Sequence, residues 1–141
     1  MAIAVGQRAS VSVVVADADT AIQAGSGDVP VLATPRLLAL AEAATVAAIS
    51  PQLPSGMTSV GTSASLEHRR ASLVGAEVVV EAELTEVDGR RLVFSFIARE
   101  DGPPGPDGDD GGDRVVGAGT VERVVVDREV FLARAAAGHR R

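Results

Sequence analysis

The chain has 141 residues, a formal net charge of −6 and no cysteine. The acidic balance argues against nucleic-acid binding, which needs a basic surface to displace counterions from phosphates, and the absence of cysteine excludes disulfides, a thiolate nucleophile and zinc–cysteine sites. The length predicts a single domain over residues 1–141. Because the sequence has neither an apolar run long enough to cross a membrane nor a signal-peptide pattern, we expect a cytoplasmic protein without membrane contact.

A strand and a long helix are the first elements expected along the chain. Valines alternate with other residues in the segment 9–18, which is the period of a strand, and the Gly- and Pro-containing segment 23–30 ends it. A helix is predicted to start with Thr34 as N-cap and Pro35 in the first helical position, and to run to about Ser50. Since this helix is apolar on nearly all sides, we expect it to be buried.

Four extended segments are predicted after the helix. Alternation in the first of them places His68 on the apolar face, and Asp88-Gly89 predicts a two-residue hairpin turn between the second and the third. A loop of Gly, Pro and Asp only, 101–113, is expected to be flexible, and Asp127 is expected to cap a short helix before the tail, 138–141. The predicted strands are 58–69, 77–87, 90–99 and 115–127, with Val78, Val80, Ala82, Leu84, Leu92, Phe94, Phe96 and Ala98 facing inward.

This order of elements predicts an α+β fold in which an antiparallel β-sheet wraps around one long central helix, the arrangement known as the hotdog fold. A single sheet of about five strands leaves a strand edge and much of the helix uncovered. A homodimer, or a tetramer built from such dimers, is therefore expected.

Three polar side chains are candidates for a site. Glu42 has no basic residue within one helical turn, and burying an unpaired carboxylate is costly, so both a functional and a solvated surface role are open. Thr34 is either only a helix cap or a site hydroxyl, and His68 is either a core or interface histidine or a proton-transfer group. Thr34 and Glu42 lie about 12 Å apart along one helix, so a shared site needs a substrate between them or a second subunit. With two histidines in the chain, no metal site is expected.

Four blocks of sequence, in this order, carry a resemblance to a known family: ATPRLLALAEAA, SVGTSASLEH, VDGRRLVFSFIA and GAGTVERVVVD. Over about residues 31–131 the sequence is similar to the fluoroacetyl-CoA thioesterase group of hotdog thioesterases. The resemblance implies that Thr34, Glu42 and His68 are the catalytic set and that the backbone at Gly61 lies beside the thioester. The implied reaction is the hydrolysis of an acyl-CoA-type thioester to free acid and thiol.

The resemblance also implies a chemical role for each of these three residues. Glu42 would attack the carbonyl or activate water, His68 would move protons or orient that carboxylate, and Thr34 would position a group or act as the nucleophile. No separate cofactor is expected, because coenzyme A is part of the small-molecule substrate. Its phosphates need arginine, and the nearest candidates are Arg36, Arg69, Arg70 and Arg123.

The sequence departs from the family pattern at two places. Val121 stands where the family often has a histidine, so any role of that second histidine is absent. The segment 23–33 has none of the aromatic residues that shield the pocket of the specialised fluoroacetyl enzyme, so the acyl group stays open. The alternative to an enzyme is a non-catalytic hotdog module that binds an acyl-CoA or another apolar small ligand. A hydratase is less favoured, because no Asp closely precedes His68.

Overall fold

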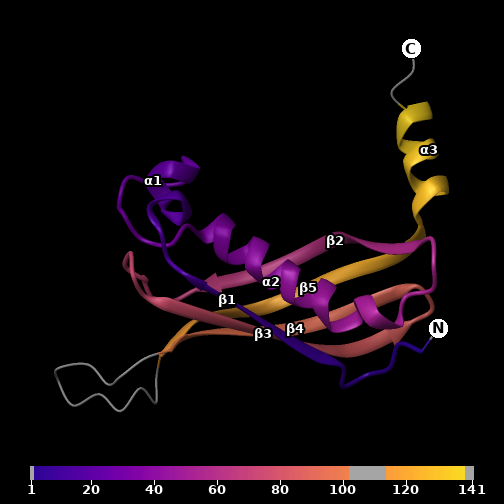
Figure 1. Ribbon diagram of the computed structural model, residues 1–141, viewed down its shortest axis with the longest axis horizontal. Coiled ribbons are helices and arrows are strands. Elements are labelled where there is room, and N and C mark those ends of the chain that lie inside the picture. Colours follow the sequence, from indigo (N-terminus) through magenta and orange to yellow (C-terminus); the bar gives the residue numbers. More distant parts are fainter. Residues whose placement is uncertain (1, 102–113, 139–141) are drawn as a thin grey trace.

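A five-stranded antiparallel sheet with one long helix across it makes up most of the described chain, residues 2–101 and 114–138 of this computed structural model (Figure 1). In chain order the elements are β1 (Arg8–Val14), η1 (Asp17–Asp19), α1 (Ala21–Ala24), α2 (Thr34–Ile49), η2 (Ser50–Gln52), β2 (Met57–His68), β3 (Glu77–Asp88), β4 (Arg91–Asp101), β5 (Val115–Asp127) and α3 (Arg128–Gly138). The strand order is β1-β3-β4-β5-β2, so β1 and β2 are the edges of the sheet. The predicted α+β arrangement is confirmed.

Apolar side chains hold α2 against the sheet. The helix packs mainly on β1 and β3, and its buried residues join those strands in one large cluster. A smaller cluster lies at the C-terminal end of α2 and is built around Phe94 and Ile49. Every residue predicted to face inward from β3 and β4 is buried. This packing fixes the position of α2, and therefore of the polar side chains it carries, over the sheet.

The start of α2 differs from the prediction by one residue. Ala33 is the N-cap, Thr34 is the first helical residue and no side chain caps the helix. Leu37 N–H donates to the carbonyl of Ala33, which gives the first turn a backbone bond instead. Pro35 lacks an N–H at either of the first two helical positions, so the shift loses no hydrogen bond. The hydroxyl of Thr34 is consequently available for another partner.

A β-bulge interrupts β2. Gly61 pairs with Arg123 of β5, and Ser63 pairs with Glu122, so Thr62 is an extra residue on β2. The predicted uniform alternation from residue 58 to 68 is therefore wrong. Before the bulge the odd-numbered residues, including Gly61, face α2, whereas after it the even-numbered residues do.

Two other local predictions need correction. The turn between β3 and β4 is Gly89-Arg90 rather than Asp88-Gly89, because Asp88 pairs with Arg91. Gly89 has a φ of 60°, which glycine adopts without strain. The first strand ends at Val14 rather than at residue 18, since η1 and the short α1 follow it. Helices this short leave no apolar period in the sequence.

The end of the chain follows the sequence analysis as far as it is described. Asp127 caps α3, because Val130 N–H donates to its Oδ1 at 3.0 Å. The expected acidic loop 101–113 and tail 138–141 lie outside the described residues, except for Asp101 and Gly138, which end β4 and α3.

The expectation of a buried α2 holds for one side only. Ala39, Ala43 and Val46 are exposed on its other side in the single chain, with Val46 42% exposed. The central part of the edge strand β2, residues 61–65, is also exposed. No helix in the described part of the chain is long and apolar enough to cross a membrane.

Candidate active site

A hydrogen bond joins the start of α2 to the end of β2. Thr34 Oγ1 and His68 Nδ1 lie 2.8 Å apart. The pair forms because Ala33, not Thr34, is the helix cap and because the bulge directs His68 toward α2. In a neutral imidazole Nδ1 accepts from the hydroxyl in one tautomer and donates to it in the other.

His68 is half-buried, and this affects its protonation. Burial lowers the pKa of His68 below its ordinary value of 6.5, and the backbone of Arg70 partly opposes the shift. The imidazole is therefore neutral at pH 7 and able to take up a proton. Its Nε2 is buried and has no hydrogen-bond partner among the described residues.

Glu42 has a partner that comes from a distant strand. Arg123 on β5 places Nη1 3.4 Å from Glu42 Oε2, and its other two nitrogens donate to Ser59: Nε to the hydroxyl at 2.8 Å and Nη2 to the carbonyl at 3.0 Å. The Arg123 side chain is 8% exposed, whereas that of Glu42 is 40% exposed. The guanidinium is thus fixed inside the protein and holds a carboxylate that reaches the surface.

Burial and pairing oppose each other at Arg123. Burial lowers the pKa of the Arg123 guanidinium, while the adjacent Glu42 carboxylate raises it. Arginine nevertheless stays charged in proteins, so a cation remains in the interior. A buried cation is costly unless ion pairs and hydrogen bonds compensate it, and here Glu42 and Ser59 supply them.

The carboxylate of Glu42 rests against the backbone of β2 beside an open hollow. A Cβ atom placed on Gly61 would lie 2.7 Å from Glu42 Oε2, closer than side chains normally approach, so only glycine leaves the carboxylate in this position. A hollow of about 220 Å³ adjoins it and is lined by Glu42, Gly61, Thr62, Ser63 and Ala64. A small substrate group therefore has room next to the carboxylate.

The other arginines expected to bind phosphates lie in different places. Of these four arginines, Arg123 is the one that contacts Glu42 in the described part of the chain. The remaining three make ion pairs elsewhere: Arg36 with Asp19 at 2.8 Å, Arg69 with Glu67 at 3.0 Å and Arg70 with Glu100 at 3.7 Å. A role for Arg36, Arg69 or Arg70 in substrate binding stays a prediction.

The sequence analysis expected His68 to orient Glu42, whereas in the single chain His68 bonds Thr34 and the partner of Glu42 is Arg123. It put Arg123 among the phosphate-binding candidates and made no use of Ser59. One signal was available: Arg123 alternates with Val121 and Val125, both buried, so it occupies the inward face of β5. A charged residue in a buried face of valines requires a partner of opposite charge. Val121 itself, at the position of the family's frequent histidine, is a core residue with 1% exposure.

The chain thus carries two polar pairs at different points along α2. Thr34 with His68 lies near the N-terminus of the helix, and Glu42 with Arg123 lies about 12 Å further along it. Within one chain the pairs do not meet. The described residues contain no cluster of three or more His, Asp or Glu suited to a metal ion.

The neutral state of His68 is testable by titration. We expect its imidazole to titrate below 6.5 in an NMR experiment on the His139→Gln variant, which keeps one histidine signal. As the pH falls through 6.5 the unfolded chain binds the proton first, so the free energy of unfolding decreases, until the pH passes the folded-state pKa. Titration of His68 at or above 6.5 would contradict this assignment, and His68→Asn should remove that part of the pH dependence.

Comparisons with known proteins identify the family of this chain and its fold. Residues 15–129 match the family model described as fluoroacetyl-CoA-specific thioesterase. The fluoroacetyl-CoA thioesterase of Streptantibioticus cattleyicolor is 38% identical over 104 residues, which cover 74% of this chain and 67% of that protein. A solved structure of the fluoroacetyl-CoA thioesterase FlK superimposes with a TM-score of 0.82 at 31% identity, covering 97% of this chain and 98% of FlK.

A more distant relative supports the fold alone. A hot-dog-like protein from Thermanaerovibrio acidaminovorans has a TM-score of 0.82 at 23% identity, and the match covers 97% of this chain and 93% of that protein. The hotdog fold expected from the sequence is confirmed by these structures. The chain belongs to the fluoroacetyl-CoA-specific thioesterase family, a group of hotdog-fold thioesterases.

Proposed function

We propose that this protein is a homodimeric thioesterase that hydrolyses acyl-CoA esters with Glu42 as the group acting at the carbonyl. The observation that carries the proposal is the half-exposed Glu42 carboxylate, held by the buried Arg123 beside a hollow at Gly61. Family membership supports the reaction class. Of the relatives, the one from Streptantibioticus cattleyicolor is named for fluoroacetyl-CoA, and a mutant of FlK has been solved in complex with acetyl-CoA.

The chemistry follows from the surroundings of each residue. Glu42 either takes a proton from the water that attacks the thioester carbon, or attacks it directly, expelling the thiolate and forming an anhydride that water then hydrolyses to the free acid. Arg123 holds Glu42 Oε2 beside the hollow. The backbone at Gly61 lies beside the thioester, where only a residue without a side chain fits. Neutral His68, bonded to Thr34, takes up and returns a proton so that the acid and the free thiol leave.

A second copy of the chain would bring the two polar pairs together. The edge strand β2 has an unpaired side, and its residues 61–65 are exposed. If two β2 strands pair antiparallel about a two-fold axis through Ser65, with Thr62 excluded from the pairing by the bulge, residue 61 of one chain lies opposite residue 68 of the other. Glu42 and Gly61 of one subunit then face Thr34 and His68 of its partner. The pairing would also cover the exposed side of α2. Tetramer formation and a cytoplasmic location stay predictions.

Thiol release from a panel of acyl-CoA esters tests the reaction. We expect the wild type to hydrolyse at least one short or medium acyl-CoA, and Glu42→Gln to lower kcat by about a hundredfold or more, because the amide is neither a base nor a nucleophile. Glutamine keeps an oxygen acceptor for Arg123 but not the charge that compensates this buried cation, so the melting temperature should fall while the chain still folds at the assay temperature. Glu81→Gln on the exposed face of β3, away from the site and from β2, is the matched control with unchanged activity. Ligand-induced thermal shifts without any thiol release would instead favour the non-catalytic module.

Gly61→Ala tests the contact between the carboxylate and the strand. The new methyl group would displace Glu42 Oε2, which is the end of a flexible side chain, so the fold tolerates the change while the carboxylate loses its position. We expect a loss of kcat/KM of about tenfold or more with little change in the melting temperature. Gly138→Ala, at a position with open space, serves as the control. Full activity of Gly61→Ala would exclude the proposed arrangement.

Mixing two inactive variants tests whether subunits share the site. Glu42→Gln and His68→Asn chains are unfolded together and refolded, which allows mixed dimers to form. In the shared arrangement each mixed dimer holds one intact site, so about a quarter of wild-type activity should return. If each chain holds a complete site of its own, no activity returns on mixing. Size-exclusion chromatography with light scattering checks that both variants are dimers.

A further inference from the structure

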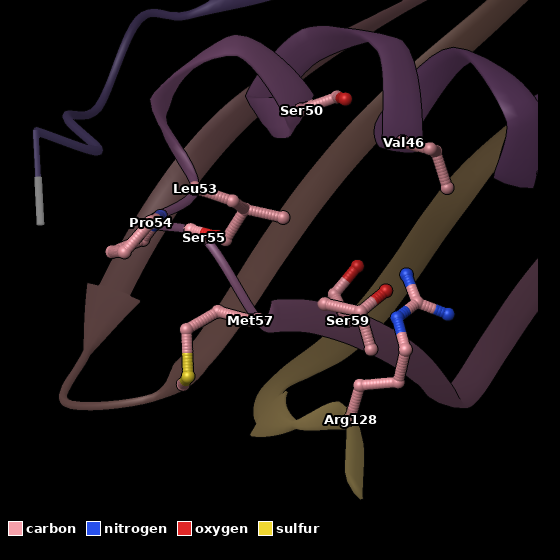
Figure 2. Close-up of a pocket in the computed structure, with 10 residues that line it drawn as sticks. Val46, Ser50, Leu53, Pro54, Ser55, Met57, Ser59 and Arg128 are labelled. Atoms are coloured by element: carbon pink, nitrogen blue, oxygen red, sulfur yellow. The ribbon is translucent and has the colours of Figure 1, made fainter.

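A second hollow lies one helical turn beyond Glu42. It has a volume of about 320 Å³ and is formed where the end of α2, the following loop, the start of β2 and the start of α3 meet. Figure 2 shows its lining side chains, with Arg128 extending from α3 into the space between Ser59 on β2 and Val46 on α2. The residues that line it are Val46, Ser50, Leu53, Pro54, Ser55, Gly56, Met57, Thr58, Ser59 and Arg128.

This hollow continues the candidate active site. Val46 follows Glu42 by four residues, so it lies about 6 Å further along the same side of α2. Ser59 precedes Gly61 by two residues on the same face of β2, and its hydroxyl accepts a hydrogen bond from Arg123. A substrate with its thioester in the hollow beside Glu42 and Gly61 can therefore extend its acyl group past Val46 and Ser59 into the second hollow.

The lining has a definite chemical character. Val46, Leu53 and Met57 supply apolar surface suited to methylene groups, and three serine hydroxyls lie among them. Arg128 is the charged residue of the lining, and it makes no ion pair with any other described residue. A free guanidinium with adjacent hydroxyls binds a carboxylate through paired charge-assisted hydrogen bonds.

Nearby charges leave this guanidinium available to a ligand. The Asp127 carboxylate beside it caps α3, accepting from Val130 N–H. The C-terminal end of α2 carries a partial negative charge, but its carbonyl at Val46 accepts from Ser50 N–H, and such a dipole is equivalent to about half a charge that acts only within the last turn. The charges of Glu42 and Arg123 cancel, so Arg128 gives the two hollows together a net charge of one positive unit.

We propose that the second hollow is an acyl subsite for a group that ends in a carboxylate, so that the preferred substrates are CoA monoesters of short dicarboxylic acids. The proposal rests on the thioesterase function proposed above. Arg128 binds the terminal carboxylate, and Val46, Leu53 and Met57 contact the methylene groups. Ser59 lies about 6.6 Å from Gly61 along β2, so the second hollow begins within reach of a short diacid acyl group such as succinyl or glutaryl.

Matched substrate pairs test the proposal. Thiol release is measured with succinyl-CoA against butyryl-CoA and with glutaryl-CoA against pentanoyl-CoA, pairs of equal carbon number. The wild type should show a kcat/KM about tenfold or more higher for the diacid esters. Arg128→Met should remove this preference and leave the neutral esters within about twofold, and Arg128→Lys should keep part of it. Arg134→Met, an equivalent change on α3 outside the hollow, should alter neither.

Two results would overturn the proposal. Equal or higher kcat/KM for the neutral esters in the wild type excludes a carboxylate subsite. An equal loss for both members of a pair in Arg128→Met assigns Arg128 to the coenzyme A portion instead. Calorimetry on the Glu42→Gln variant separates this question from catalysis: glutaryl-CoA should bind about tenfold tighter than pentanoyl-CoA, and Arg128→Met should cancel the difference. If the protein hydrolyses no acyl-CoA, the proposed function fails, while this binding comparison still decides the subsite.

Discussion

The buried guanidinium of Arg123 is the constraint on which the candidate site depends. Removing one member of a buried ion pair typically costs about 3 to 5 kcal/mol, because the remaining charge is left without compensation. Here Ser59 provides two acceptors and Glu42 provides the opposite charge, so β5, β2 and α2 are joined at one point. The pair is asymmetric, since Arg123 is almost fully enclosed while Glu42 reaches solvent. The enclosed cation fixes the carboxylate and still leaves it accessible to a substrate.

The bulge at Thr62 lets one strand serve both polar pairs. Gly61 and His68 are seven positions apart, so in a regular strand their side chains would point to opposite faces. One inserted residue restores them to the same face, toward α2. Thr34 and Glu42 are eight positions apart on α2, about 2.2 turns, so their side chains are about 80° apart around the helix axis and both can reach β2. The polar groups of α2 therefore lie opposite those of β2, with Thr34 at His68 and Glu42 at Gly61. Because β2 is an edge strand, both places are accessible to a second chain.

Hydrophobic periodicity was sufficient to predict the sheet and the central helix. The positions of the site residues, however, depend on local contacts that periodicity does not reveal. The core faces of β3 and β4 alternate without interruption, and each predicted inward residue is buried. The bulge was not predictable in this way, because both halves of β2 alternate well and only a pairing partner reveals the extra residue. The pairing of Glu42 with Arg123 joins residues 81 positions apart, and no sequence spacing encodes it. The helix start was placed one residue too late, with Thr34 as the cap instead of Ala33, and of the two uses left open for the Thr34 hydroxyl the structure shows a bond to His68.

The groups proposed for cleavage and for acyl selection lie on different parts of this fold. The groups next to the thioester come from α2 and from the middle of β2 and β5, all of which are fixed by the core. The second hollow is instead bounded by the loop from Leu53 to Gly56 and by the start of α3, which projects away from the sheet (Figure 1). Loops and terminal elements vary more easily than packed strands. Membership of a thioesterase family therefore constrains the reaction more strongly than the acyl group, and a two-carbon acyl group at Glu42 would leave the space around Arg128 to water.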